Sequence, residues 1–155
     1  MITIRRVLVI QILLLWQGGF LFYTAVVVST GTAVLGSAAA QGAITARVTD
    51  VLNILGVFGL AILAIELGLA RDPAAQRTAA RWWCWWIAFV CQGLLFAFHR
   101  LLDAYMDPTR MYVVIRPPFY PVHRMYLWAS TVQWLACLVF VWLTIQAWRA
   151  EDSQA

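Results

Sequence analysis

The feature that most constrains this chain is the long stretch without charge that follows Arg6. No Asp, Glu, Lys or Arg occurs between Arg6 and Arg47, and three further apolar stretches follow, each bounded by Arg, Asp or Pro. A transmembrane helix needs about 20 consecutive apolar residues. Within the hydrocarbon core a helix pairs all of its own backbone groups. The sequence therefore predicts an all-α protein that crosses a bilayer four times.

The composition supports a membrane location. Of the 155 residues, 63% are hydrophobic and 12% are charged, with a mean hydropathy of +0.78. Soluble domains carry about 25% charged residues. The basic residues are all Arg and lie at the ends of apolar stretches, which suits anchoring at the lipid interface and not nucleic-acid binding. Residues 1–155 are expected to form a single integral membrane domain with the lipid bilayer as its surroundings.

Capping residues and helix breakers divide the chain into spans. Thr45, Thr49 or Asp50 would begin the second helix, and Asp72-Pro73 would end it. The result is a four-helix transmembrane bundle of up-down topology, with both termini on one face. The predicted helices cover about residues 5–30, 46–70, 82–105 and 122–149.

Two connections are predicted to differ in character. The small-residue segment 29–41 is expected to be a loop. The segment Met111–Pro121 contains three prolines and several aromatic residues, so it is expected to lie against the membrane or the bundle mouth.

The distribution of Arg gives a weak orientation signal. The face with the termini would carry Arg5, Arg6, Arg71, Arg77, Arg81 and Arg149, and the other face Arg47, Arg100, Arg110, Arg116 and Arg124. Because Arg100 and Arg124 fall within predicted helices, the positive-inside rule favours cytoplasmic termini.

Polar side chains recur on one side of the third and fourth predicted helices. Gln92, His99 and Asp103 follow helical spacing, and a second set recurs every seven residues: His123, Ser130, Cys137 and Thr144. One interpretation is a packing seam, where small residues allow close approach. The other is a ligand-binding cluster at one mouth of the bundle, made of Gln92, His99, Arg100, Asp103, His123 and Arg124.

Such a cluster would bind a metal ion, a haem, an anionic headgroup or a proton-carrying substrate. Imidazole ligates metals and titrates near neutrality, so His99 and His123 are the candidate metal or haem ligands. Asp103, four residues after His99, would orient that imidazole.

Apart from the candidate cap Asp50, Glu66 is the single acid inside the second predicted span. Carboxylates within a membrane are rare and are usually paired. Glu66 is therefore expected to pair with an arginine near the termini, namely Arg5, Arg6 or Arg81. A role in proton relay would require deeper polar partners, for which Gln11, Gln17 and Asn53 are the candidates.

Motifs of soluble enzymes are absent. The sequence has no P-loop, no dinucleotide-binding glycine fingerprint, no GxSxG and no HExxH. Cys84, Cys91 and Cys137 form no CxxC pair and are expected to be small core residues.

Two short segments of the first and last predicted spans carry a recognisable pattern. They read Trp16-Gln17-Gly18-Gly19-Phe20-Leu21-Phe22-Tyr23 followed by Val26-Val27-Val28, and Phe119-Tyr120-Pro121-Val122-His123 with Ser130 one heptad later. The pattern resembles copper-resistance-D-like membrane proteins, which include uncharacterised four-helix members and the four-helix protoporphyrinogen oxidases of bacterial haem synthesis. The resemblance is closest to the uncharacterised members and implies a bundle in the bacterial cytoplasmic membrane. The haem-dependent members carry a His where this chain has Val9, so no haem ligand is implied there.

Two classes of function stay open. The first is a small non-enzymatic membrane protein, either a ligand-binding or transport-like bundle or an accessory subunit that contacts other subunits or a second copy through its nine Trp. The second is a haem- or metal-dependent oxidoreductase that uses His99 and His123.

Overall fold

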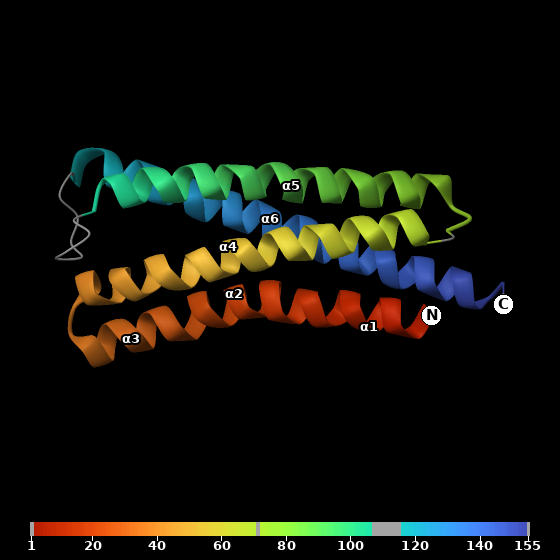
Figure 1. Cartoon of the computed structure of the whole chain (residues 1–155), viewed down its shortest axis with the longest axis horizontal. Coiled ribbons are helices and arrows are strands. Elements are labelled where there is room, and N and C mark those ends of the chain that lie inside the picture. Colours follow the sequence, from red (N-terminus) through yellow and green to blue (C-terminus); the bar gives the residue numbers. More distant parts are fainter. Residues whose placement is uncertain (1, 71, 107–115, 155) are drawn as a thin grey trace.

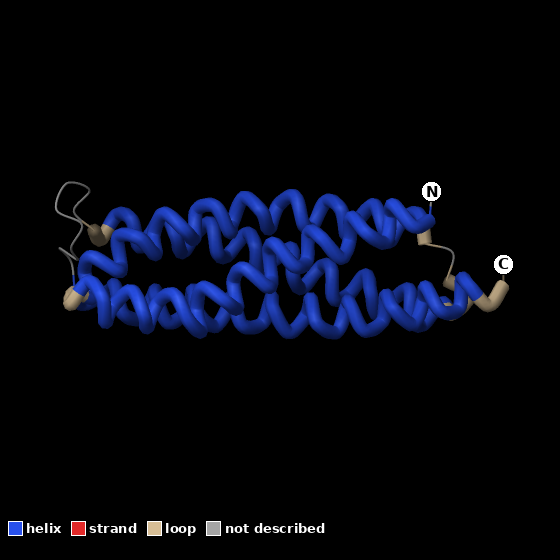
Figure 2. The backbone as a smooth tube through the Cα atoms, turned by 90° about the horizontal axis from the view of Figure 1, so that it is seen from below, coloured by secondary structure: helices blue, strands red, loops and turns tan. Residues whose placement is uncertain are grey.

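The computed structural model describes residues 2–70, 72–106 and 116–154, and within them four long helices form one elongated bundle (Figures 1 and 2). All four are long and apolar enough to cross a membrane. The N-terminal helix is a run of consecutive segments: α1 (Ile2–Leu13), η1 (Leu14–Gly18), α2 (Gly19–Phe22), η2 (Tyr23–Val27) and α3 (Val28–Leu35). The others are α4 (Ala38–Leu69), α5 (Ala75–Ala104) and α6 (Arg116–Asp152). The predicted all-α four-helix fold is confirmed.

The helices alternate in direction, so the two ends of the chain lie at the same end of the bundle (Figure 1). Each helix packs against the next along the sequence: the N-terminal helix against α4, α4 against α5, and α5 most extensively against α6. The N-terminal helix and α6 close the bundle along a seam, called the closing seam below. One cavity lies between these two helices, and a second cavity is lined by residues of all four helices, these two included.

The connection between the first two helices is much shorter than predicted. The loop prediction for residues 29–41 is wrong, because α3 continues to Leu35 and α4 begins at Ala38. Gly36 adopts a left-handed conformation with φ +60°, which ends the helix at no steric cost. Ser37 then caps α4 by accepting a 3.2 Å hydrogen bond from the Ala40 N–H.

The residues proposed as caps instead lie inside α4. The hydroxyls of Thr45 and Thr49 donate to the carbonyls of Gln41 and Thr45, at 2.9 and 2.8 Å. A side chain at Gly31 would clash with the buried amide of Gln41, which donates to the Tyr23 hydroxyl at 3.2 Å. The small and polar residues of this region therefore serve close packing between two helices and do not mark a loop.

The third and fourth helices also begin earlier than predicted, at Ala75 and Arg116 in place of 82 and 122. Pro117 and Pro118 occupy the first turn of α6. Backbone N–H groups in a first turn have no carbonyl partner within the helix, so proline, which lacks this N–H, loses no hydrogen bond there. Of the segment expected to lie against the membrane, residues 111–115 fall outside the described residues, and the rest forms the start of α6.

The main apolar core lies between the middle of the bundle and the end with the termini. Its buried members are Val9, Trp16, Leu60, Leu63, Leu67, Ala88, Ala136, Cys137 and Phe140. Trp16 fits against the glycines of α4, since a Cβ atom at Gly59 would lie 2.5 Å from Trp16 Cε3. This close fit fixes the N-terminal helix on α4.

Candidate functional site

Polar side chains gather at three levels along the bundle. An outer cluster (Asp50, His99 and Asp103) lies towards the α5–α6 connection. A central cavity follows, with Gln17, Asn53, Ser130 and Gln133 among its lining residues. A charge network lies at the end with the termini and contains Arg5, Arg6, Glu66, Arg81, Glu151 and Asp152.

The outer cluster contains two residues of the site predicted from sequence, His99 and Asp103. The buried imidazole of His99 places Nε2 at 2.7 Å from Asp50 Oδ1 and 3.6 Å from Asp103 Oδ2. Its alignment with Asp103 was predicted from spacing, whereas Asp50 was taken only as a helix cap. The partner was missed because the length of α4, and hence its alignment with α5, was underestimated.

The other members of the predicted cluster are dispersed. Arg100 and Arg124 are exposed, and Gln92 lies deeper in the bundle. His123 is half-buried and stacks on Phe119, with ring centroids 5.8 Å apart. Among the described side chains the two imidazoles make no direct contact, and no three His, Cys, Asp or Glu side chains are grouped to hold a metal ion. A ligand shared by His99 and His123 stays a prediction.

The charge network surrounds Glu66, whose side chain has no exposed surface. Arg5 Nε lies 2.9 Å from Glu66 Oε2, and Arg81 Nη2 lies 3.4 Å from Oε1. The indole N–H of Trp148 donates to Oε1 at 2.8 Å. Arg81 is equally buried and donates through Nε to Thr144 Oγ1 at 3.1 Å. Glu66 is thus paired, as expected for a carboxylate in a membrane.

The third arginine considered for Glu66 has other partners. Arg6 lies 2.8 Å from Asp152 Oδ1 and 3.1 Å from Glu151 Oε2. Arg5 shares Glu151, at 2.6 Å. Because three arginines meet three carboxylates, the network carries no surplus charge for a ligand, and we assign it a structural role.

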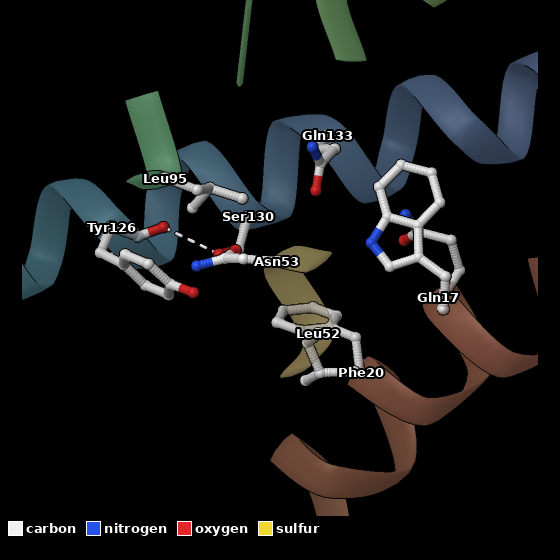
Figure 3. Close-up of a pocket in the computed structure, with 9 residues that line it drawn as sticks. Gln17, Phe20, Leu52, Asn53, Leu95, Tyr126, Ser130 and Gln133 are labelled. Atoms are coloured by element: carbon white, nitrogen blue, oxygen red, sulfur yellow. Dashed lines mark hydrogen bonds between the residues drawn. The ribbon is translucent and has the colours of Figure 1, made fainter. Parts of the chain in front are cut away.

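The central cavity has a volume of about 20 Å³ (Figure 3). It is lined by Trp16, Gln17, Phe20, Leu52, Asn53, Leu95, Tyr126, Ser130 and Gln133, which come from all four helices. Gln17 and Asn53 are only 9% and 3% exposed, and among the described residues neither amide nitrogen makes a hydrogen bond of regular geometry, although that of Asn53 points towards the Tyr126 hydroxyl (Figure 3). A space of this size holds about one water molecule or one oxygen atom.

Three other polar side chains at or beside the cavity, Gln92, Ser130 and Gln133, are hydrogen-bonded. Gln133 Nε2 donates to Gln92 Oε1 and to the Ala88 carbonyl, each at 3.1 Å. Gln92 Nε2 donates to the Asn53 carbonyl at 3.2 Å. Ser130 donates to the Tyr126 carbonyl at 2.9 Å, the bond drawn in Figure 3. The framework is therefore held in place while two amide nitrogens stay unpaired.

Sequence reasoning noticed Gln17 and Asn53 only as remote partners for Glu66. What it missed is that Trp16 and Gln17, although adjacent, are both buried in the bundle. They belong to η1, a π-helical segment, and such wider turns are frequent at functional sites. The available signal was a pair of amide side chains within apolar spans, since polar residues in a membrane call for a specific role.

No protein-family model, curated protein or solved structure matches the chain. The likeness to copper-resistance-D-like proteins therefore stays a prediction from short motifs. Of the residues that carry it, Trp16, Gln17, Phe20 and Ser130 line the central cavity.

Proposed function

We propose that the protein is a ligand-binding, transport-like membrane bundle whose binding site is the central cavity. The observation that supports this most is that the amide nitrogens of Gln17 and Asn53, on two different helices, lack partners beside one cavity. An unpaired buried donor costs about 1–3 kcal/mol, which is tolerated where a ligand supplies the missing acceptor. The lining side chains are amides, hydroxyls and apolar groups, so the cavity suits an uncharged polar group.

The surroundings of the cavity favour access from the α5–α6 connection. Asn53 lies six residues along α4 from the exposed Arg47, a rise of about 9 Å. Between them are Thr49 and Asp50, the latter with a 46% exposed side chain. Towards the termini, the apolar core and the charge network close the bundle. We place both termini in the cytoplasm of a bacterial cell, so this entrance would face outward.

Asn53 is the single asparagine of the chain, which gives the cavity its own spectroscopic probe. We would label asparagine and, in a second sample, glutamine with ¹⁵N, reconstitute the protein in lipid nanodiscs and follow exchange of the side-chain amides after transfer to D₂O. We expect the Asn53 amide to exchange much faster than that of Gln92, which is equally buried but hydrogen-bonded.

A matched pair of variants ties the exchange to the cavity. Ser130→Leu would fill it and slow the exchange at Asn53. Thr131→Leu changes the adjacent exposed residue and should leave the exchange unchanged. Protection of Asn53 equal to that of Gln92 in the unmodified protein would show a sealed cavity and overturn the proposal.

A further inference from the structure

A second cavity lies on the closing seam, nearer the termini. It measures about 70 Å³ and is lined by Val9, Ile10, Leu13, Val141, Thr144, Ile145 and Trp148. Five of these seven side chains are pure hydrocarbon. Ile10 and Ile145 are 47% and 41% exposed, so the seam faces the bilayer at this level. Hydrocarbon of the membrane therefore has direct access to this apolar cavity.

The two cavities follow each other along the same pair of helices. On the N-terminal helix, Leu13 of the apolar cavity is one turn from Gln17 of the central cavity. On α6, Gln133 and Val141 are eight residues apart, a rise of about 12 Å. A polar pocket and an apolar pocket at this separation along one seam match the two ends of an elongated amphiphile.

We propose that the ligand is a single-chain amphiphile taken from the bilayer, whose uncharged head carries a hydrogen-bond-accepting oxygen. The proposal rests on the proposed function and names the ligand class of the same site. The head oxygen accepts from Gln17 Nε2 and Asn53 Nδ2, and the hydrocarbon chain runs along the closing seam into the apolar cavity.

Physical chemistry restricts the head and the orientation. A charged head would lose its hydration in a cavity lined by no ionised side chain, at a cost that two amides cannot offset. The cavity volume of about 20 Å³ admits one oxygen atom, as in an alcohol or a carbonyl group. The head of the ligand lies nearer the α5–α6 connection and its chain runs towards the termini. Lipids of the leaflet on the α5–α6 side have the same orientation.

The test uses a photoreactive long-chain alcohol, hexadecanol with a diazirine in its chain, in phosphatidylcholine vesicles that contain the full chain. After illumination, mass spectrometry should place the label at seam residues such as Leu13, Val141 and Ile145. Excess unlabelled hexadecanol should suppress this label several-fold, whereas butanol, with the same head and a short chain, should not. Addition of hexadecanol should also shift the Asn53 side-chain amide resonance.

Two variants of α6 make the result specific. Val141→Trp fills the apolar cavity and should reduce the seam label several-fold. Val139→Trp makes the same change at a residue that is 47% exposed to lipid and should have no effect. Equal labelling of seam and lipid-exposed positions in the unmodified protein, without competition, would overturn the proposal whether or not the variants fold.

The outcomes separate this inference from the proposed function. Fast D₂O exchange at Asn53 with no seam label would leave a binding cavity but exclude an amphiphile as its ligand. A protected Asn53 amide together with no seam label would remove both proposals.

Discussion

Trp148 and Glu66, 82 residues apart in sequence, are joined by a 2.8 Å hydrogen bond from the indole N–H to Oε1. Arg5 and Arg81 hold the same carboxylate from two other helices. One buried carboxylate thus connects all four helices of the bundle at the end with the termini. A charge in such a place is tolerated only while every partner is present.

Neutralising this carboxylate should destabilise the protein strongly. Glu66→Gln leaves Arg81 buried without its counter-charge, and removing one partner of a buried pair costs about 3–5 kcal/mol. Unfolding by steric trapping in bicelles would measure the loss. The control is Asp152→Asn, whose carboxylate is 61% exposed and is paired with Arg6, and for which we expect a much smaller loss. Equal effects of the two changes would show that burial of Glu66 does not govern the network.

Gly59→Ala should loosen the contact between the N-terminal helix and α4. The added Cβ atom would lie 2.5 Å from the rigid indole of Trp16, so one helix must shift, and overpacking of this kind costs about 1–3 kcal/mol. Gly68→Ala, in the same helix with open space around the new atom, should be neutral or stabilising by up to about 1 kcal/mol. Thermal unfolding in nanodiscs compares the two. A similar response at both positions would contradict the tight fit of Trp16.

Asn53→Leu should raise stability, because it removes an unpaired buried amide and keeps a similar volume. The expected gain is about 1 kcal/mol in ligand-free protein. Gln92→Leu should instead lower stability, since it removes two hydrogen bonds and leaves Gln133 Nε2 with only its bond to the Ala88 carbonyl. Thermal midpoints in nanodiscs give the signs. A loss of stability in Asn53→Leu would mean that its amide nitrogen has a structural partner.

Stability of the α4–α5 connection should fall in acid through Asp72. Burial alone would raise the pKa of Asp72, but hydrogen bonds from Arg77 Nε at 2.6 Å and the Ala74 N–H at 2.9 Å lower it below its ordinary value. Because the pKa is lower in the folded state, the stabilisation is present above the unfolded-state pKa and is lost as pH falls through the folded-state pKa. The stability difference between wild type and Asp72→Asn should therefore shrink from about pH 7 to about pH 3. A difference independent of pH would contradict this role.

The number and approximate position of the spans could be predicted from sequence because hydropathy alone decides them. The positions of the helix ends could not be predicted in this way. Threonine is common at helix N-caps, so Thr45 and Thr49 were predicted to be caps. In the structure their hydroxyls instead donate to backbone carbonyls one turn earlier in α4. Likewise Gly31 is typical of a loop, yet here it admits Gln41 between two helices.

Partners across the bundle were predicted only where charge restricted the choice. Glu66 was expected to pair with an arginine because Arg5, Arg6 and Arg81 were predicted at its end of the bundle and a carboxylate in a membrane needs a partner. The central cavity depends on how far each helix is rotated and shifted along its neighbours. Those quantities follow from contacts such as Trp16 with Gly59, and spacing within one helix carries no information about them.

The charge network also imposes an order on assembly. Arg6 finds Glu151 and Asp152, residues that the ribosome adds about 145 positions later. Arg5 can pair with Glu66 as soon as α4 is in place, but until α6 has been translated and inserted Arg6 has neither of its carboxylates and must stay at the lipid headgroups or with a chaperone. The N-terminal end of the first helix is therefore completed only when the last helix arrives, and an insertion factor that shields it in the meantime would act on Arg6.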